Sequence, residues 1–273
     1  MTIKANCKIN IGLDVIERRA DGFHELSTVM YPVKGLFDTL NIEITEGNSV
    51  EFSSSGIIID CDTKNNLCIK AYNLMKSLYP FIGGVHIALD KQVPFGAGLG
   101  GGSSDATAVL VALDSLFGLQ LDEQRLIELA AVLGSDTAFF VRNTPQLCSG
   151  RGEIMTDAKV DLSGKYLLLI KPEVNVSTRE AYAGVKPAHP LKPLYELIKL
   201  PVERWQGEIK NDFESHIFKA YPLLGKIKED LLAAGALYAA MSGSGSTIFG
   251  IFDSEQKAKS EQLKSYSPFI FQE

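Results

Sequence analysis

The stretch Pro94-Phe-Gly-Ala-Gly-Leu-Gly-Gly-Gly-Ser-Ser-Asp-Ala-Thr107 is the most informative part of this chain. Five of the seven residues from Gly96 to Gly102 are glycine, which leaves a backbone that another group can approach closely. Ser103 and Ser104 follow at once, and either can cap a helix whose apolar residues recur with the helical period. A glycine loop that leads into a helix N-terminus collects unpaired N–H donors at the positive end of the helix dipole. This pattern predicts a phosphate-binding site.

Neither of two common phosphate-binding motifs accounts for the glycine stretch, one because of its sequence and the other because of its context. The P-loop pattern is absent because no lysine follows the glycines. The dinucleotide pattern G-x-G-x-x-G is met by Gly96, Gly98 and Gly101, but that turn should directly follow a buried parallel strand. Here the segment 85–90 alternates like a half-exposed strand, and four residues separate it from the Phe95-Gly96 pair. A dinucleotide-binding oxidoreductase and a tight turn without a ligand remain the alternatives.

The composition predicts a globular protein of one large or two modest domains. The chain has 273 residues, of which 45% are apolar, and its formal charge is −6. That charge argues against a general surface for nucleic acid or acidic membranes, so an anionic substrate needs locally placed cations. The longest apolar runs are too short to span a bilayer, and the N-terminus lacks the apolar core of a signal peptide. We therefore expect a cytoplasmic protein with no nucleic-acid or membrane partner, and the oligomeric state stays open.

The cysteines indicate neither a disulfide framework nor a zinc site. Cys7, Cys61, Cys68 and Cys148 are scattered along the chain without C-x-x-C spacing. This usage fits a reducing compartment. It also leaves protein ligands for a metal unknown.

The N-terminal segment alternates regularly between apolar and polar residues from Ala5 to Val15, as a strand does. Residues two apart on a strand lie on one side, roughly 6–7 Å from each other. Lys8 and Asn10 therefore point together, away from the apolar face, which we expect to leave them on an exposed face. A lysine in such a place is either a solubilising group or a functional cation.

A turn at Asp21-Gly22 precedes the pair Phe23-His24. An aromatic ring directly after a turn has little to pack on. It either folds back onto the core or forms a stacking platform for a planar ligand group, with His24 supplying hydrogen bonds. The residues alone do not decide between these two interpretations.

The first half of the chain is predicted to contain several strands and helices. The expected strands cover Leu26–Val33, Leu40–Thr45, Ser49–Ser53 and Val85–Asp90, and the expected helices cover Asn66–Tyr79, Ser103–Phe117 and Asp122–Leu133. Ser135 is a plausible cap, which would place Asp136 in the first turn of a short helix. An acid there is either a partner of the helix dipole or a reactive group.

The second half is predicted to begin near residues 155–164 with a new strand over Tyr166–Lys171. The further elements are helical runs at Glu180–Val185, Pro193–Ile198 and Asn211–Ala234, strands at Leu237–Met241, Thr247–Phe252 and Phe269–Phe271, and a helix from Ser254. The loop Ser242-Gly-Ser-Gly-Ser246 is a second glycine-rich bend that could close over the same ligand. Helices and antiparallel hairpins in both halves predict an α+β protein with two lobes.

Three stretches resemble, in the right order, the signature sequences of the GHMP kinases (galactokinase, homoserine, mevalonate and phosphomevalonate kinases). They are the strand that carries Lys8, the glycine stretch that ends in Gly-Leu-Gly-Gly-Gly-Ser-Ser104, and Met241-Ser-Gly-Ser-Gly-Ser-Thr247. The resemblance implies a two-lobed fold. It consists of an N-terminal mixed α/β lobe over residues 1–155 and a C-terminal ferredoxin-like lobe over residues 156–273, with the active site between them.

Within the family, four segments resemble the members that phosphorylate the 2-hydroxyl of a diphosphocytidyl-linked polyol in the non-mevalonate isoprenoid pathway. The segments are Lys8-Ile-Asn10, Arg18-Arg-Ala-Asp-Gly-Phe-His24, Pro94–Ser104 and Asn211-Asp-Phe-Glu214. Homoserine and mevalonate kinases need no platform for a nucleobase on the acceptor. The Asp-Gly-Phe-His segment therefore discriminates among family members.

The resemblance also implies roles for individual residues. Lys8 and Asp136 match the catalytic pair. The residues that match the ATP site are Asn66, Lys91, Pro94, Phe95, Gly96, Ala97, Gly98, Leu99, Gly100, Gly101, Gly102, Ser103 and Ser104. The residues that match substrate contacts are Asn10, Phe23, His24 and Tyr182, with Phe23 and Tyr182 on either side of the cytosine. ATP with Mg²⁺ is the implied co-substrate, and no tightly bound cofactor is implied.

Three positions depart from the family pattern. Phe95 and Ala97 stand where smaller or different residues are common, and Ala138 replaces a frequent proline after the matched acid. Another GHMP small-molecule kinase is the main alternative function. A non-catalytic nucleotide-binding paralogue is a second one, although it would have no need to retain both Lys8 and Asp136.

Overall fold

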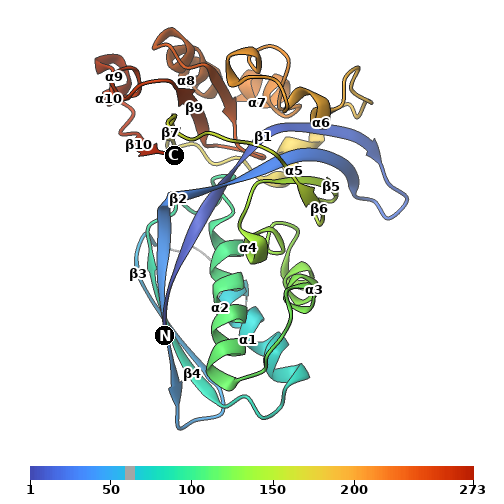
Figure 1. Cartoon of the computed structure of the whole chain (residues 1–273), viewed down its shortest axis with the longest axis vertical. Coiled ribbons are helices and arrows are strands. Elements are labelled where there is room, and N and C mark those ends of the chain that lie inside the picture. Colours follow the sequence, from blue (N-terminus) through green and yellow to red (C-terminus); the bar gives the residue numbers. More distant parts are fainter. Residues whose placement is uncertain (59–64) are drawn as a thin grey trace. The chain divides into compact units, whose positions relative to one another are not determined.

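The computed structural model describes residues 1–58 and 65–273, so Cys61 lies outside the described residues. The chain forms two compact units, drawn in Figure 1. The first unit comprises Met1–Lys8, Pro32–Phe95 and Gly100–Thr144, and the second comprises Ile9–Tyr31, Gly96–Leu99 and Pro145–Glu273. The predicted lobe boundary after residue 155 stays a prediction.

In the first unit, a mixed sheet is covered by helices. Strand β3 (Val50–Gly56) pairs in parallel with β4 (Gly84–Lys91), and β4 pairs antiparallel with the C-terminal part of β2 (His24–Thr45). The helices are α1 (Leu67–Leu78), α2 (Gly101–Phe117), α3 (Glu123–Leu133) and the short α4 (Phe139–Arg142). The predicted helices over residues 66–79, 103–117 and 122–133 are confirmed apart from small shifts of their ends.

The helix ends explain those shifts. The side chain of Asn66 caps α1 by accepting the Cys68 N–H at 2.9 Å. Helix α2 begins at Gly101, with Gly100 in the left-handed conformation as its N-cap and no side-chain cap. The prediction that Ser103 or Ser104 caps this helix is therefore wrong, because the turn at Gly100 starts the helix before either serine.

The second unit contains a four-stranded antiparallel sheet in the order β10-β7-β9-β8. The strands are β7 (Tyr166–Ile170), β8 (Tyr238–Met241), β9 (Ile248–Phe252) and β10 (Phe269–Gln272). Numbered along the chain, these four strands stand in the order 4-1-3-2, which is the ferredoxin-like arrangement that was predicted. The core includes Leu224, Ile227 and Leu231 of helix α8, packed with sheet residues such as Leu168.

The predicted single helix over residues 211–234 is two helices. Helix α7 (Glu214–Ala220) ends before Tyr221, and α8 (Pro222–Ala233) begins with a proline at its first position. Proline has no N–H to continue the ladder of a preceding helix, but it fits the first turn of a new one. Pro222 therefore divides the run. The remaining short helices are α5 (Thr178–Ala183), α6 (Leu194–Leu197), the 3₁₀ turn η2 (Val202–Arg204), α9 (Glu255–Ala258) and α10 (Glu261–Lys264).

Two long strands contribute residues to both units. Strand β1 (Thr2–Arg18) and β2 are each continuous, so the predicted division of β2 into strands at 26–33 and 40–45 is wrong. The division failed because the partner of β2 changes along its length: β5 (Gln146–Gly150) pairs with 26–30 and β4 with 39–45. The hairpin of β5 with β6 (Ile154–Asp157) was not predicted.

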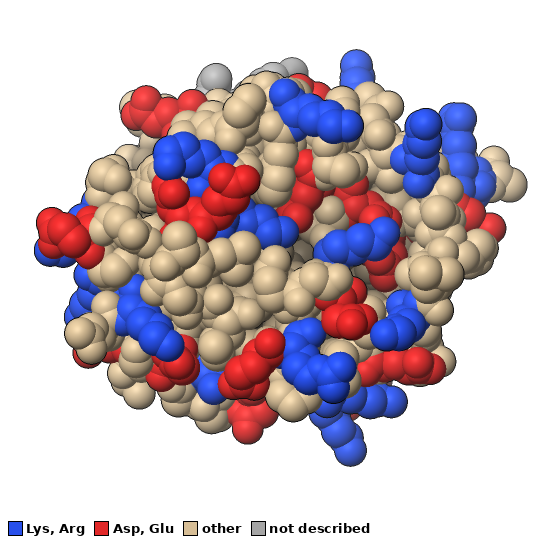
Figure 2. Space-filling model, turned by 90° about the horizontal axis from the view of Figure 1, so that it is seen from above, with Lys and Arg blue, Asp and Glu red and all other residues tan. Residues whose placement is uncertain are grey.

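The surface charges and the helix lengths can be compared with what the composition predicts. Figure 2 shows acidic and basic side chains interspersed on the face in view rather than gathered by sign. Among the described residues, no helix is long and apolar enough to cross a membrane.

Candidate active site

The N-terminus of α2 presents backbone N–H groups at the end of the glycine stretch. The first turn of an α-helix has N–H groups without partners inside the helix, and it carries the positive end of the helix dipole. In α2 this turn consists of Gly101, Gly102, Ser103 and Ser104, after Gly100 with φ 68°. Ser104 is buried, and its N–H bonds to the Gly100 carbonyl at 2.9 Å. The remaining amides of the turn form the kind of site that binds phosphate.

Lys8 and Asp136 lie together in the first unit, as the resemblance implied for a pair. The Nζ of Lys8 is 3.1 Å from Oδ2 of Asp136. A Cβ added to Gly100 would lie 3.1 Å from both the Cε of Lys8 and the ring of Phe140. The start of α2 is therefore packed directly against the lysine of this ion pair.

Asp136 does not sit in the first turn of a helix, so that prediction is wrong. Residues 135–138 form a turn, and α4 begins only at Phe139. The Thr137 N–H donates to the Gly134 carbonyl at 3.3 Å, while the Thr107 hydroxyl of α2 donates to the Thr137 carbonyl at 2.8 Å. These bonds hold the turn, and with it Asp136, against α2. Thr107 had no signal in the sequence beyond its place in a helix.

The polar face of β1 is buried, which corrects the expectation of an exposed face. Asn6, Lys8 and Asn10 are 7%, 3% and 3% exposed. Each has a partner for its side chain: Asn6 bonds with Asn143, Lys8 with Asp136, and Asn10 donates to the Thr28 hydroxyl at 3.0 Å. Burial makes the solubilising interpretation of Lys8 wrong, because a buried ammonium group requires a specific partner.

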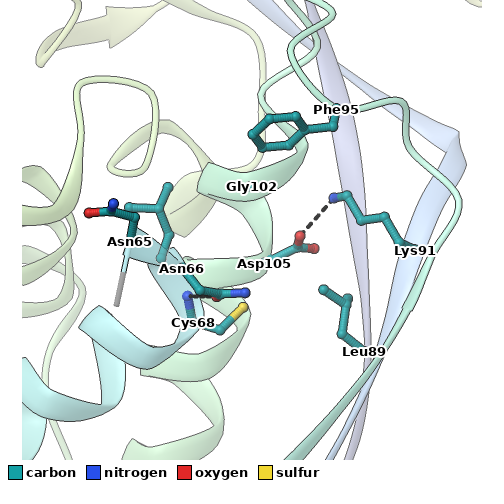
Figure 3. Close-up of a pocket in the computed structure, with 9 residues that line it drawn as sticks. Asn65, Asn66, Cys68, Leu89, Lys91, Phe95, Gly102 and Asp105 are labelled. Atoms are coloured by element: carbon teal, nitrogen blue, oxygen red, sulfur yellow. Dashed lines mark hydrogen bonds and ion pairs between the residues drawn. The ribbon is translucent and has the colours of Figure 1, made fainter. Parts of the chain in front are cut away.

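A cavity of about 250 Å³ lies beside the start of α2 (Figure 3). Residues predicted for the ATP site that line it are Asn66, Lys91, Phe95 and Gly102, and the other lining residues are Asn65, Leu67, Cys68, Leu89 and Asp105. The cavity therefore collects residues from four separate parts of the sequence. Their contact with ATP stays a prediction.

Lys91 belongs to a buried cluster of charges that the sequence did not reveal. Its Nζ lies 2.7 Å from Oδ2 of Asp105 and also bonds to Asp38, and all three side chains are at most 3% exposed. Asp38 accepts two backbone N–H bonds in addition, from Gln92 and Val93. Burial lowers the pKa of Lys91, but the carboxylates of Asp105 and Asp38 outweigh it and raise the pKa.

Asp105 is the carboxyl group of this cluster whose affinity for a proton is raised. Burial raises its pKa to about 7, against the opposing effect of Lys91 and with an addition from Asp38. Its Oδ1 is buried without a hydrogen-bond partner among the described residues. The Ser-Ser-Asp sequence after the glycines was the only signal that could have pointed to this residue.

In the second unit, the two glycine-rich stretches contact each other. The Ser242 hydroxyl donates to the Gly98 carbonyl at 2.8 Å, and the Thr247 N–H donates to the Ala97 carbonyl at 3.2 Å. A Cβ on Gly98 would stand 2.0 Å from the Ser242 carbonyl oxygen, and Gly98 has φ 74°. Only glycine fits this position, which explains one glycine of the run by packing and not by a ligand.

The aromatic residues after the first turn form a cluster in the second unit. The rings of His24 and Tyr182 are stacked with centroids 4.8 Å apart, and Tyr182 meets Phe213 edge to face at 4.9 Å. Phe23 is 53% exposed, and the guanidinium of Arg151 lies 5.0 Å from its ring centroid. The interpretation that Phe23 folds back onto the core is wrong. The predicted sandwich of a base between Phe23 and Tyr182 stays a prediction.

The other residues predicted for the ATP site differ in their exposure to solvent. Ala97 and Leu99 are buried, whereas Phe95 is 49% exposed. Gly96 has no atom within 4 Å of an added Cβ. The exposed members of the stretch are thus the ones that a ligand could reach without a rearrangement.

The sequence matches the family models for the GHMP kinases N terminal domain over residues 66–144 and for the GHMP kinases C terminal domain over residues 195–265. Together with the fold and the glycine-rich site, these matches establish that the chain belongs to the GHMP kinases, small-molecule kinases that use ATP as co-substrate. This confirms the predicted family and fold, and it excludes a dinucleotide-binding oxidoreductase.

Individual relatives carry a more specific name. A Bacteroides fragilis protein named 4-diphosphocytidyl-2-C-methyl-D-erythritol kinase is 44% identical over 254 residues, which is 92% of each chain. The crystal structure of a 4-(cytidine 5'-diphospho)-2C-methyl-D-erythritol kinase matches with a TM-score of 0.82 and 31% identity, covering 99% of this chain and 98% of that one. A homoserine kinase from Cytophaga hutchinsonii matches with a TM-score of 0.70 over 99% of this chain and 93% of that one, but at 19% identity it shares the fold alone.

Proposed function

We propose that this chain transfers the γ-phosphoryl group of ATP to the 2-hydroxyl of 4-diphosphocytidyl-2-C-methyl-D-erythritol, a step of non-mevalonate isoprenoid synthesis. The observation that carries the proposal is the Lys8–Asp136 ion pair at 3.1 Å, packed against the N-terminal turn of α2 through Gly100. The names of relatives at 44% identity supply the acceptor.

The N-terminal turn of α2 holds the phosphates of ATP in this proposal. Phosphoryl transfer needs little covalent help from the protein, so positioning and charge neutralisation supply most of the catalysis. The amides of Gly101, Gly102 and Ser103 serve both purposes because they point at the site with the helix dipole. The cavity lined by Asn66, Lys91 and Phe95 then takes the base of ATP.

Mg²⁺ enters this proposal as part of its ATP complex. The described residues contain no group of three or more His, Cys, Asp or Glu side chains that could hold a metal ion. In this proposal the ion is bound by the phosphates of ATP. When bound there, Mg²⁺ offsets charge on the phosphates.

Asp136 accepts or orients the proton of the reacting hydroxyl. Its carboxylate is 31% exposed, whereas its partner Lys8 is 3% exposed, so a ligand can reach the aspartate side of the pair. The buried ammonium of Lys8 offsets negative charge on the group in transfer.

Recognition of the cytosine falls to the second unit. Phe23 offers an exposed ring, and the His24–Tyr182 stack offers a second aromatic surface with a hydrogen-bonding group. Asn10 is a further substrate contact by resemblance. Base recognition is thus assigned to residues other than those assigned to phosphoryl transfer. A cytoplasmic location and the absence of nucleic-acid and membrane partners remain part of the proposal.

One assay tests the proposed function. ATP consumption is measured with 4-diphosphocytidyl-2-C-methyl-D-erythritol, and in parallel with homoserine and with mevalonate. We expect turnover with the first acceptor only, and its loss in an Asp136→Asn control. Turnover with homoserine or mevalonate instead would assign the chain to another GHMP activity, which the shared fold with homoserine kinase makes the second candidate. Binding of ATP without any turnover would favour a non-catalytic nucleotide-binding protein.

A further inference from the structure

The segment Asn211-Asp-Phe-Glu214 has no part in the chemistry proposed above, yet its side chains at Asn211 and Glu214 are polar and buried. Asn211 is 3% exposed. Its Nδ2 donates to the carbonyls of Met241 and Gly243, both at 2.8 Å, and its Oδ1 accepts the Phe213 N–H at 3.0 Å. The side-chain amide of Asn211 thus donates hydrogen bonds to the two carbonyls that flank Ser242, where the 242–246 loop begins.

The neighbours of Asn211 hold two strands. Glu214 accepts the Met241 N–H at 2.8 Å, so the end of β8 is bonded through both its N–H and its carbonyl. Asp212 accepts the Val15 N–H at 2.8 Å, and its own N–H donates to the Leu13 carbonyl at 2.9 Å. The segment therefore ties β1 to the end of β8. We call Asn211, Asp212 and Glu214 the clamp.

The loop that the clamp holds is in turn bonded to two stretches assigned to ligands. The Ser242 hydroxyl donates to the carbonyl of Gly98 at 2.8 Å and accepts the Asn10 N–H at 3.2 Å. Gly98 precedes by two residues Gly100, where α2 is capped. A displacement of Ser242 would therefore move the glycine loop just before the helix turn assigned to phosphate.

We propose that Asn211 is a positioning residue for nucleotide binding and phosphoryl transfer: it fixes the 242–246 loop, and Ser242 of that loop fixes Gly98 and the backbone of Asn10. The proposal rests on the proposed function for its catalytic part. A misplacement of about 1 Å can cost on the order of 100-fold in rate, so hydrogen bonds remote from the reacting atoms can control turnover.

The informative variant is Asn211→Asp. It keeps the size of the side chain and the acceptor for the Phe213 N–H, but it replaces the donor to Met241 and Gly243 by an oxygen that faces two carbonyls. Ser242→Ala removes the next link, the hydroxyl between Gly98 and Asn10. If both changes act through the same loop, their effects should not add.

Gln206→Ala is the matched control. The Gln206 side chain accepts the Ala239 N–H at 3.1 Å, so it also bonds to β8 but at a residue that does not adjoin the loop. It should leave nucleotide binding and turnover unchanged, and its effect on stability should simply add to that of Ser242→Ala. Asn211→Gln, which retains the amide group, is a conservative variant whose partial recovery would support the role of the donor.

The experiment measures the dissociation constant of a non-hydrolysable ATP analogue by calorimetry, kcat with the diphosphocytidyl acceptor, and the melting temperature. We expect Asn211→Asp and Ser242→Ala each to weaken analogue binding or to lower kcat by roughly 10-fold or more, and the double variant to be no worse than the poorer single one. Multiplying effects, or a lower melting temperature with normal binding and turnover in the folded protein, would overturn the proposal. A wild-type chain that binds the analogue but does not phosphorylate the acceptor would overturn the proposed function, while the binding cycle would still test the clamp.

Discussion

The Nζ of Lys8 lies 3.1 Å from Oδ2 of Asp136, and the lysine is buried while the aspartate is partly open to solvent. This asymmetry separates two tasks within one ion pair. The buried cation lies where a Cβ on residue 100 would come within 3.1 Å of its Cε, so the glycine at this position leaves room for the lysine. In the proposed reaction, the more accessible carboxylate of Asp136 is the member that the substrate hydroxyl contacts.

Asp136→Asn should lower kcat by about 10²–10⁴-fold, which is the usual contribution of a positioned acid–base group. ATP affinity should stay nearly unchanged, because the amides assigned to the phosphates lie on α2 and are not altered. Steady-state kinetics and calorimetry with ATP check both parts. If the variant instead loses both nucleotide affinity and thermal stability, Asp136 has a purely structural role in the turn formed by residues 135–138.

Gly102→Val should weaken ATP binding by roughly 10-fold or more, because the new side chain would occupy the cavity beside α2. Gly102 lines this cavity, and an added Cβ would have only the Leu67 Cδ1 within 4 Å, at 3.7 Å. The variant should therefore fold, and affinity for the cytidyl substrate should change little. A loss of this size corresponds to about 1.4 kcal/mol.

Gly101→Val is the contrasting variant for that test. A Cβ at Gly101 would lie 2.9 Å from Val93 and 3.0 Å from the Nζ of Lys91, so this variant should lose stability even without ATP. Thermal denaturation separates the two glycines. Unchanged ATP affinity in a folded Gly102→Val protein would exclude the cavity as part of the nucleotide site.

Phe23→Ala should raise KM for the diphosphocytidyl substrate by about 5–150-fold. Stacking of a base on an aromatic ring contributes roughly 1–3 kcal/mol, and about 1.4 kcal/mol is a factor of ten. The melting temperature should move little because the ring is 53% exposed. ATP affinity, measured by calorimetry, should remain as in the wild type.

Tyr182→Ala serves as a comparison for Phe23→Ala, because we expect it to affect stability as well as substrate affinity. Tyr182 packs between His24 and Phe213, so its removal should lower both stability and affinity for the cytidyl substrate. A Phe23→Ala protein that unfolds early and loses both ligands together would contradict the role of Phe23 as a platform.

Asp14→Asn should stabilise the protein at neutral pH and have little effect near pH 4. Burial and the carboxylate of Asp212 raise the pKa of Asp14 from 3.8 to about 6, with Lys210 acting in the opposite direction. The folded state thus binds the proton more tightly than the unfolded state, so wild-type stability falls as pH rises from about 4 to about 6. Removing the charge should gain about 1–2 kcal/mol above pH 7, after allowance for solvent screening. Denaturant unfolding between pH 4 and 8 checks the window, and an equal effect at all pH values would exclude titration as its cause.

Local patterns carried much of the fold. The alternation of β1 and the helix that follows the glycines could be predicted, because each depends on residues close together in the sequence. The ferredoxin-like strand order of the second half was implied by the family resemblance, since it depends on pairings such as that of β10 with β7. The points at which a strand ends were harder to predict from the sequence. The unbroken course of β2 depends on pairing with β4 and β5, whose residues are distant in the chain.

The glycine stretch and its helix were thus determined by the sequence itself, since few residue types permit such a loop, whereas the pairing of Lys8 with Asp136 was implied by the family resemblance. Only the tertiary structure decided that Lys91 lies between Asp38 and Asp105, and that Asn211 holds the carbonyls of Met241 and Gly243. The physical reason is burial. A polar group removed from water must find its partner wherever the folded chain supplies one, and in these clusters that partner is 14 to 53 residues away.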